Sequence, residues 1–399
     1  MHADHGQPAT RSPAWLEALS DRLLARERED LRRARRDPID AGLIDLSSND
    51  YLALRCDARL IDASARAGEM FGVGSGASRL VREADETVRA LERRFAAFKH
   101  AEEALLLTSG YVANLAVLTS LVSPGDLILL DKLCHASLLD GARLTRATIR
   151  DVTVRTFPHL AYERAHDLAT RHQGGTVWLV TDSVFSMDGD VCDLPALAHV
   201  REVLPSCAIV LDEAHATGVL GETGAGLNET AEPMHRADVV VSTASKALGS
   251  LGGIVSGTGV VIESLVNFAR GFVYSTGVTP TQVAAIGAAL DVVRAEPDRR
   301  ARLRAISGRV RGAALSAGFA VPASREPTPI VPLVVGEAER AVRLAGRLRE
   351  AGVFAPAIRP PSVAPGSARV RLSLHAGLTD QQIACVERAI ASAGADGAC

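Results

Sequence analysis

Two stretches of the sequence decide the fold: residues 208–215, AIVLDEAH, and residues 239–246, VVVSTASK. Each opens with an unbroken apolar run, which is typical of a strand buried on both faces of a parallel sheet. Each run ends at polar residues, Asp212 in the first and Ser242 in the second. Four further apolar runs, at residues 105–107, 127–130, 177–180 and 254–255, alternate with helical segments. This alternation predicts an α/β fold, an open sheet with helices on both faces.

The composition excludes several classes of protein. Of the 399 residues, 47% are hydrophobic and 23% charged, which is typical of a folded globular protein. The 44 basic and 47 acidic residues give a net charge of −3, which argues against nucleic acid as a partner. No apolar run approaches the ~20 residues of a membrane span, and residues 1–11 have no apolar signal-peptide core. Six cysteines without a CxxC pair favour a reduced, cytoplasmic compartment.

The chain is predicted to have three parts. Residues 1–47 form an N-terminal arm and a helix, which Ser12 caps and which runs through the arginines at 32, 33, 35 and 36 to stop before Pro38. We interpret those arginines as a solvated helix face. Residues 48–290 form the large α/β domain. Residues 291–399 form a smaller α+β domain, because helical segments there bracket two apolar strands at residues 330–335 and 369–374.

Polar side chains follow five of the predicted strands. Ligands of open α/β sheets bind at the carboxyl ends of the strands, so these side chains should share one site. Two of the turns are small and rich in hydroxyls, Ser109-Gly110 and Thr243-Ala244-Ser245. The first precedes a predicted helix at residues 113–121. A helix N-terminus offers free amides, so these turns favour a bound phosphate.

The same strand ends supply one acid, one lysine and two histidines, which are Asp212, Lys246, His135 and His215. A phosphate cradle, an acid and a lysine together suit pyridoxal phosphate, in which the lysine forms a Schiff base and the acid pairs with the pyridinium nitrogen. Each residue alone has a simpler interpretation: Asp212 as a helix cap, Lys246 as a surface lysine, either histidine as structural. The chain has no HxH or HExxH spacing and no Cys/His cluster, so no metal site is predicted.

A near match to the dinucleotide pattern GxGxxG/A occurs at residues 72–77, GVGSGA. That pattern requires a strand before it and a βαβ unit around it. Residues 60–70 have helical periodicity instead. The sequence therefore does not predict a nicotinamide or flavin site.

Several motifs in the chain, taken together, resemble the α-oxoamine synthases, the acyl-CoA-condensing branch of the fold-type I pyridoxal phosphate enzymes. The motifs are residues 48–52 (SNDYL), 74–80 (GSGASRL), 109–111 (SGY), 135–137 (HAS), 184–190 (VFSMDGD), 212–215 (DEAH) and 245–249 (SKALG). The resemblance covers residues 12–390. It implies a large domain with a mostly parallel sheet, a smaller α+β C-terminal domain, and a homodimer with active sites at the interface.

The resemblance also implies a role for individual residues. Lys246 would be the Schiff-base lysine and general base, and Asp212 the partner of the pyridinium nitrogen. His135 would stack on the cofactor ring and donate to the thioester oxygen, while His215 would bond the phenolic oxygen of the ring. The remaining cofactor contacts would come from Ser109, Gly110, Tyr111, Ser186 and Thr243, with Ser275 and Thr276 reaching the neighbouring subunit's phosphate. The substrates would be bound by Arg32, Asn49, Arg359, Ser362 and Arg371.

Residues 357–361 (AIRPP) and 369–372 (RVRL) most resemble the biotin-pathway branch of this family. That branch implies a decarboxylative condensation of L-alanine with a pimeloyl thioester of coenzyme A or of acyl carrier protein. Another α-oxoamine synthase, with a different amino acid or acyl donor, is the main alternative. A partner subunit that keeps the fold without the chemistry is the alternative from another class, and the presence of Lys246, Asp212 and His215 argues against it.

The sequence departs from the family pattern at Arg82, Glu83 and Val88, where the family has Ser-Gly and a histidine. We hypothesise that this segment lines the entrance for the acyl donor. The simpler interpretation is that both charges face solvent, because charged side chains are mostly solvated.

Overall fold

The computed structural model describes residues 13–28, 32, 38–82 and 86–395. Its largest element is a seven-stranded sheet in the order β2-β8-β7-β6-β5-β3-β4. The strands are β2 (Glu103–Leu107), β3 (Leu127–Asp131), β4 (Thr153–Phe157), β5 (Val177–Asp182), β6 (Cys207–Asp212), β7 (Val239–Thr243) and β8 (Gly253–Gly257). Strands β3 to β7 pair in parallel, and β8 pairs antiparallel with both β2 and β7. The predicted α/β fold with a mostly parallel sheet is confirmed.

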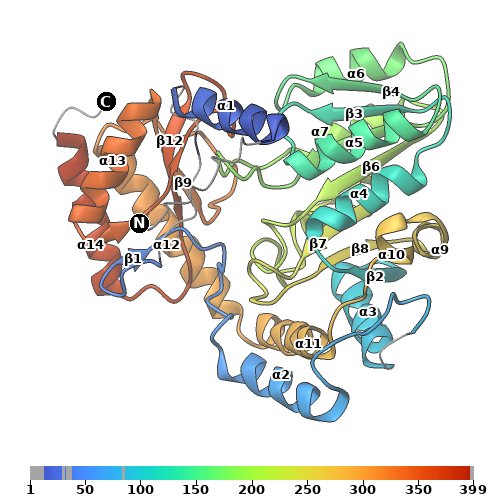
Figure 1. Cartoon of the computed structure of the whole chain (residues 1–399), viewed down its shortest axis with the longest axis horizontal. Helices are drawn as coiled ribbons and strands as arrows, with labels where there is room; N and C mark the ends of the chain where they lie inside the picture. The colour runs from blue at the N-terminus through green and yellow to red at the C-terminus, as the bar shows by residue number, and fades with distance from the viewer. Residues whose placement is uncertain (1–12, 29–31, 33–37, 83–85, 396–399) are drawn as a thin grey trace, which may run out of the picture.

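Helices cover both faces of this sheet (Figure 1). The helices around it are α2 (Ala58–Phe71), α3 (Glu86–Lys99), α4 (Gly110–Leu121), α5 (Ala136–Thr148), α6 (Tyr162–Thr170), α7 (Leu194–Glu202), α9 (Gly259–Phe268), α10 (Arg270–Val273) and α11 (Pro280–Ala295). Successive strand residues enter two separate apolar clusters. Leu127 and Leu129 of β3 belong to one cluster, and Ile128 and Leu130 belong to the other. Both faces are therefore buried, which is why these strands appear in the sequence as unbroken apolar runs.

A second, smaller sheet lies on the other side of the molecule (Figure 1). It has the antiparallel order β11-β12-β9, formed by β9 (Ile330–Gly336), β11 (Ala357–Ile358) and β12 (Ala368–Ser373). The helices α12 (Pro297–Ser316), α13 (Ala338–Glu350) and α14 (Asp380–Ala395) accompany it. Near it, β1 (Ile44–Asp45) pairs in parallel with β10 (Val353–Phe354). The division at residues 47 and 290 stays a prediction.

The N-terminal helix is shorter than predicted. Helix α1 (Ala14–Arg28) ends before Arg32, which is exposed, lies outside any helix and pairs with Glu27 at 2.7 Å. The side chains of α1 are all exposed, so no packing supports a further extension of the helix. The predicted cap Ser12 and the arginines at 33, 35 and 36 lie outside the described residues.

Strand β4 was not predicted, because its sequence TVRTF has no continuous apolar run. It lies at the edge of the sheet and pairs with β3 alone, so Arg155 and Thr156 can stay exposed. None of the described helices combines the length and the apolar character needed to cross a membrane.

A buried ion pair joins α3 to the turn that follows β6. The ammonium of Lys99 pairs with the carboxylate of Glu213, and their side chains are 2% and 0% exposed. Lys99 Nζ also donates to Thr217 Oγ1 at 2.9 Å and to the carbonyl of Ala225. Glu213 accepts a further hydrogen bond from the Asn228 amide at 2.7 Å. This network anchors Glu213, which lies between Asp212 and His215, and Thr217, which follows them.

We expect Lys99→Met to lower the free energy of unfolding by about 3–5 kcal/mol, because it leaves the Glu213 carboxylate buried without its cation. Denaturant unfolding measures the change. Arg143→Met is the matched control: Arg143 pairs with Asp140 at 3.0 Å on the surface and should change stability by about 0.5 kcal/mol or less. Equal, small effects in both variants would contradict the role of the buried pair.

Candidate active site

A cavity of about 240 Å³ lies at the carboxyl ends of the parallel strands. Its walls come from the last residues of β5, β6 and β7 and from the segments that follow β2, β3, β6 and β7. This is the edge of the sheet at which the polar strand ends predict a site. The lining residues are Ser109, Gly110, Tyr111, Asn114, His135, Ser137, Asp182, Asp212, Ala214, His215, Thr243, Ser245 and Lys246.

Asp212 is the last residue of β6 and is 6% exposed. Its Oδ2 accepts a hydrogen bond of 2.6 Å from Asn114 Nδ2, and its Oδ1 accepts one of 2.7 Å from the backbone N–H of Ala214. Asn114 Nδ2 also donates to Ser137 Oγ at 2.8 Å. The segment after Asp212 is a series of turns and contains no helix, so the alternative interpretation as a helix cap does not apply.

Lys246 and His215 lie side by side at the cavity, with 2.9 Å between Lys246 Nζ and His215 Nε2. On its other side, His215 Nδ1 is 2.6 Å from the hydroxyl of Tyr51. Burial lowers the pKa of Lys246 to about 8, although Asp212 and Asp182 oppose this shift. Burial, and then the charge of Lys246, hold the pKa of His215 well below its ordinary value. His215 is therefore a neutral imidazole at neutral pH.

His135 lies before the first residue of α5, where its Nδ1 is 2.7 Å from Ser137 Oγ. Its backbone N–H points at the Asp182 carboxyl group, 3.2 Å from Oδ2. Burial lowers the pKa of His135. Burial and the neighbouring Asp212 raise the pKa of Asp182 well above its ordinary range. Two carboxyl groups thus face this cavity, those of Asp182 and Asp212.

A cradle for an anion is formed at the N-terminus of α4. Ser109 caps this helix, with its Oγ accepting from the N–H of Val112 at 3.2 Å. Gly110 packs so closely that a Cβ there would lie 3.3 Å from the Cβ of Thr243. The Thr243 hydroxyl is held by Ser245 Oγ at 2.8 Å and by the carbonyl of Gly252 at 2.9 Å. Free amides beside hydroxyls are the chemistry that binds phosphate.

A second polar cluster, centred on Arg371 of β12, adjoins the cavity through Tyr51. The Arg371 side chain is largely buried, and its residue is 6% exposed. Its Nε donates to the carbonyl of Ser186 at 2.5 Å, and its Nη1 donates to Asn49 Oδ1 at 3.1 Å and to Ser373 Oγ at 2.8 Å. Its Nη2 lies 3.4 Å from the Tyr51 hydroxyl, which in turn contacts His215. The structure thus brings the predicted Asn49, Ser186 and Arg371 together, next to the cavity and not in its wall.

Other predicted residues lie away from the cavity wall. Arg359 and Ser362 follow β11, where the Ser362 N–H donates to the Arg359 carbonyl at 3.0 Å. Thr276 forms a bridge with Ser78, and Ser275 is beside it. Tyr111, in contrast, lines the cavity, although it is 44% exposed and its hydroxyl donates to Asp140 Oδ2 at 2.7 Å.

The departure from the family pattern is only partly described. Arg82 is exposed, and Glu83 lies outside the described residues. Val88 of α3 is 1% exposed and packs into the apolar core. Val88 therefore does not line an entrance, and the hypothesis for this segment is wrong at that position. The side chain is apolar, so its removal from water in the core is favourable.

Sequence reasoning missed Asn114, Ser137, Asp182 and Tyr51 as site residues. Asp182 ends a predicted strand in the same way as Asp212, so its position contained the signal. Asn114 is four residues after Gly110 and therefore on the same helix face, which is also readable from spacing. Tyr51 contacts His215 across 164 residues of chain, a contact that local patterns do not contain.

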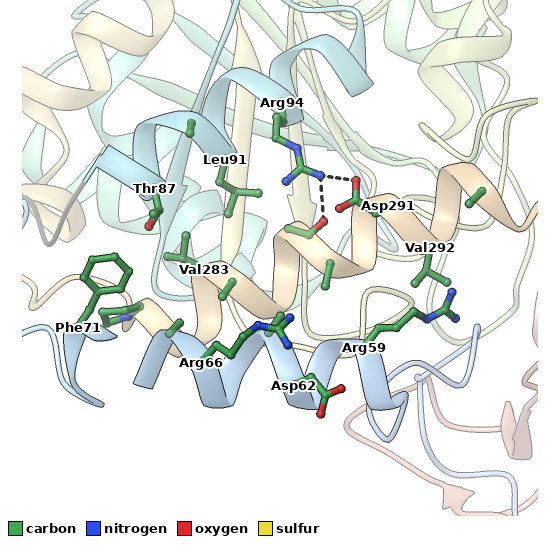
Figure 2. A pocket seen from close by; sticks show the side chains of 18 residues that line it. Arg59, Asp62, Arg66, Phe71, Thr87, Leu91, Arg94, Val283, Asp291 and Val292 are labelled. Carbon is green, nitrogen blue, oxygen red and sulfur yellow. Dashed lines mark hydrogen bonds and ion pairs between the residues drawn. The ribbon is translucent and has the colours of Figure 1, made fainter. Parts of the chain in front are cut away.

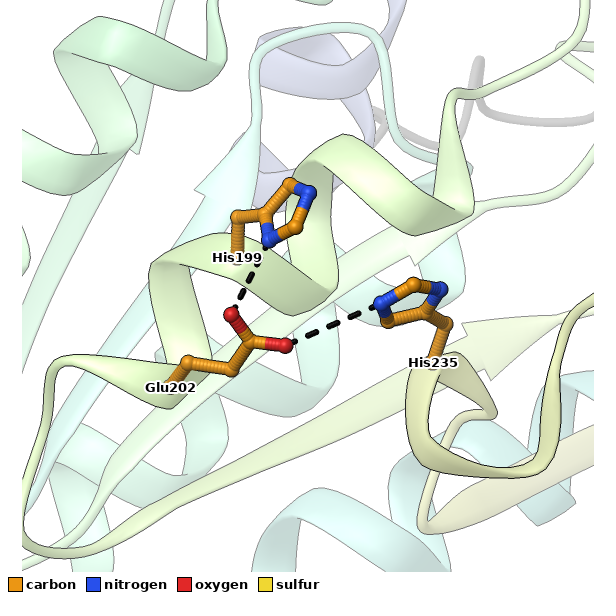
Figure 3. Close-up of side chains that lie close together, drawn as sticks. All are labelled: His199, Glu202 and His235. Atoms are coloured by element: carbon orange, nitrogen blue, oxygen red, sulfur yellow. Dashed lines mark hydrogen bonds and ion pairs between the residues drawn. The ribbon is translucent and has the colours of Figure 1, made fainter.

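Two other features of the molecule differ from this cavity in their chemistry. A larger cavity, about 650 Å³, lies between α2, α3 and α11 (Figure 2), where Arg94 is bound to Asp291 and to the Gly287 carbonyl. Its described lining has no lysine or histidine that could act as a nucleophile or base. His199, Glu202 and His235 form a surface group (Figure 3), with 3.0 Å from His199 Nδ1 and 3.7 Å from His235 Nε2 to the Glu202 carboxylate. They precede β6 and β7, at the end of the sheet opposite the cavity.

Comparison with known proteins defines the class. A family model described as "Aminotransferase class I and II" matches residues 41–390. The 8-amino-7-oxononanoate synthase of Anaeromyxobacter dehalogenans is 43% identical over 373 residues, covering 93% of this chain and 92% of that protein. The protein of the same name from Geobacter sulfurreducens is 42% identical over 350 residues, 87% of each chain.

Two solved structures agree. Serine palmitoyltransferase from Sphingomonas wittichii superposes with a TM-score of 0.86 at 26% identity, covering 98% of this chain and 99% of that one. The 8-amino-7-oxononanoate synthase of Francisella tularensis gives 0.75 at 28% identity, covering 88% and 98%. The chain belongs to the class I and II aminotransferase family and, within it, to the α-oxoamine synthases: it is a fold-type I, pyridoxal phosphate-dependent acyltransferase.

The cavity fits this cofactor. It offers a primary amine with a lowered pKa in Lys246, a buried carboxylate in Asp212 and an amide-and-hydroxyl cradle at Ser109, Gly110 and Thr243. These groups match the aldehyde, the ring nitrogen and the phosphate of pyridoxal phosphate.

We expect Lys246 of the cofactor-free protein to be acetylated with a pH midpoint near 8, because burial lowers the pKa of Lys246 to about 8. Competitive acetylation followed by mass spectrometry measures the midpoint. In the urea-unfolded protein the same lysine should have a midpoint of roughly 10.4. The same midpoint in both states would show that the folded environment does not tune this amine.

Proposed function

We propose that the chain condenses L-alanine with a pimeloyl thioester, releasing carbon dioxide and the free thiol, and that the product is the 8-amino-7-oxononanoate of biotin synthesis. The names of relatives 42–43% identical to this chain support this choice of substrates. We also propose that the reaction takes place in the cytoplasm.

The observation that carries the proposal is the environment of Arg371. Its hydrogen-bond partners in the described part of the chain are a carbonyl, an amide oxygen and two hydroxyls, with no carboxylate among them. A buried cation without an opposing charge is costly, so the site favours an anionic ligand. The guanidinium fork binds a carboxylate through two parallel hydrogen bonds. Through Tyr51 and His215, Arg371 is connected to Lys246, so a carboxylate on Arg371 would place an amino acid at the cofactor.

Pyridoxal phosphate, when bound, supplies an electron sink for negative charge at the α-carbon of an amino acid. In our proposal Lys246 holds the cofactor through its amine and, once released by the substrate, takes the proton from the α-carbon at its Nζ. Because the pKa of Lys246 is about 8, a useful fraction of this amine is neutral near neutral pH. Asp212, fixed by Asn114 and Ala214, would hold the proton of the ring nitrogen. His135 would lie against the ring and could donate a hydrogen bond to the thioester oxygen.

The binding of the acyl donor and the assembly are also proposals. Asn49, Arg359 and Ser362 are proposed to face the substrate carboxylates or the acyl donor, and Arg32 to reach the far end of the donor. The donor is proposed to be carried by coenzyme A or acyl carrier protein. We propose a homodimer, in which Ser275 and Thr276 reach the partner's phosphate site, since neither lines the cavity of its own chain. Helix α1 supports an assembly, because it exposes a row of large apolar side chains, which isolated monomers rarely do. These are Trp15, Leu16, Leu19, Leu23 and Leu24.

A product assay tests the proposed function. L-alanine, glycine and L-serine are each combined with pimeloyl, shorter and uncharged thioesters, and products are identified by mass spectrometry. We expect the highest kcat/KM with L-alanine and the pimeloyl thioester. A preference for L-serine with a long uncharged acyl chain would favour an activity like that of serine palmitoyltransferase instead, whose solved structure is also similar.

We expect Arg371→Ala to raise the KM for the amino acid at least about tenfold, because a bidentate charge-assisted pair is lost. The KM for the acyl donor should change far less. Arg371→Lys keeps the charge without the fork, so its KM for the amino acid should lie between those of the unchanged protein and of Arg371→Ala. Arg309→Ala is the control, since Arg309 forms a surface ion pair with Glu387 at 2.7 Å. An unchanged amino-acid KM in Arg371→Ala would move the carboxylate site to Arg359.

A further inference from the structure

His159, which follows β4, lies between two buried carboxylates. Its Nδ1 is 3.0 Å from Asp131 Oδ1, and its Nε2 is 2.6 Å from Asp190 Oδ2. Asp131 is 0% and Asp190 6% exposed. Because each ring nitrogen faces an acceptor, both must carry a proton, and the imidazole is a cation. Burial opposes that charge, but the hydrogen bonds and charges of Asp131 and Asp190 raise the pKa of His159 to about 10.

The two carboxylates belong to different structural units. Asp131 ends β3 and also accepts from the backbone N–H groups of Leu133 and Leu160, both at 2.8 Å. Asp190 belongs to residues 183–192, which we call the connector hairpin. Its two arms pair at Val184 and Val191. Asp190 Oδ1 has no hydrogen-bond partner among the described residues, and His159 is the cation that is hydrogen-bonded to this buried carboxylate, while the charge of Arg311 also acts on it.

The connector hairpin is the link between the end of β5 and the small sheet. Its Ser186 carbonyl accepts from Arg371 Nε, and its Asp188 carboxylate pairs with the guanidinium of Arg369. Its Gly189 carbonyl accepts from Thr328 Oγ1 at 2.6 Å. Gly189 has φ +71°, and a Cβ there would clash with the carbonyl oxygen of Ile330. The hairpin therefore fits the small sheet tightly, and its tip contacts the arginine next to the cavity.

We infer that His159 is a positioning residue: its cation holds the connector hairpin to β3 and thereby sets the orientation of Arg371 relative to Lys246. No atom of His159 lines the cofactor cavity, so its effect passes through Asp190 and the Ser186 carbonyl. This inference rests on the proposed function, in which Arg371 binds the carboxylate of the amino acid.

The test uses the holoenzyme of the His159→Gln variant. Glutamine keeps an N–H donor but has no positive charge. Asp190→Asn removes the other half of the pair and serves if the first variant does not fold. His172→Gln is the matched control, because His172 Nε2 is hydrogen-bonded to the Gly125 carbonyl, at 3.0 Å, at the opposite end of β3. Two quantities are measured: amide hydrogen exchange of residues 183–192, and the Kd for L-alanine from the absorbance change of the bound cofactor without acyl donor. The KM for the acyl donor is measured alongside them.

We expect exchange in the connector hairpin to be at least about tenfold faster in His159→Gln and Asp190→Asn, because its anchoring ion pair is lost. We expect the Kd for L-alanine to rise about tenfold and the KM for the acyl donor to stay within about twofold. His172→Gln should leave all three unchanged.

Unchanged exchange of the hairpin would overturn the inference, as would faster exchange with an unchanged Kd. Arg371→Ala, measured in parallel, separates the role of His159 from the role of Arg371. If it raises the Kd while His159→Gln does not, the proposed function stands and the positioning role of His159 is wrong. If it leaves the Kd unchanged, the carboxylate site is assigned wrongly and the inference falls with it.

Discussion

The carboxylate of Asp212 is the group on which the site depends. A buried carboxylate is stable only where hydrogen-bond donors and cations compensate for lost water. Here Asn114 of α4 and the N–H of Ala214 bind it directly, and the Lys99–Glu213 pair fixes the turn that follows. The parallel sheet makes this arrangement possible, because it brings the carboxyl ends of β2, β3, β5, β6 and β7 to one edge. Residues far apart in the chain thus converge on one cavity.

In the proposed site, the large sheet and the small sheet each contribute one half. The large sheet supplies the cavity with Lys246, Asp212 and the anion cradle, and the small sheet supplies Arg371, which adjoins the cavity. The two halves meet through the Tyr51–His215 contact and through the bond from Arg371 to the Ser186 carbonyl. The same scaffold occurs in relatives with different names, so the fold does not select the substrate. We propose that selection lies in the few groups around Arg371.

Much of the fold could be predicted because its strands are buried on both faces. An unbroken run of β-branched residues such as Val239 to Val241 favours a buried strand, and the structure places it in the parallel sheet. Edge strand β4 lacks that signal, since half of it faces solvent. The N-terminal helix was predicted too long because helical spacing says nothing about whether the helix has a surface to pack on. The strand-end rule found Asp212, Lys246 and both histidines. It could not find the contacts of Arg371 with Asn49, which is 322 residues away.

The central claim is that Lys246 is the residue that binds the cofactor covalently at this edge of the sheet. Borohydride reduction of the holoenzyme, followed by proteolysis and mass spectrometry, tests it most directly, because reduction fixes the pyridoxyl group to the lysine that carries it. We expect a single modified peptide that contains Lys246. A pyridoxyl group on another lysine, such as the exposed Lys132, with Lys246 unmodified, would contradict the claim.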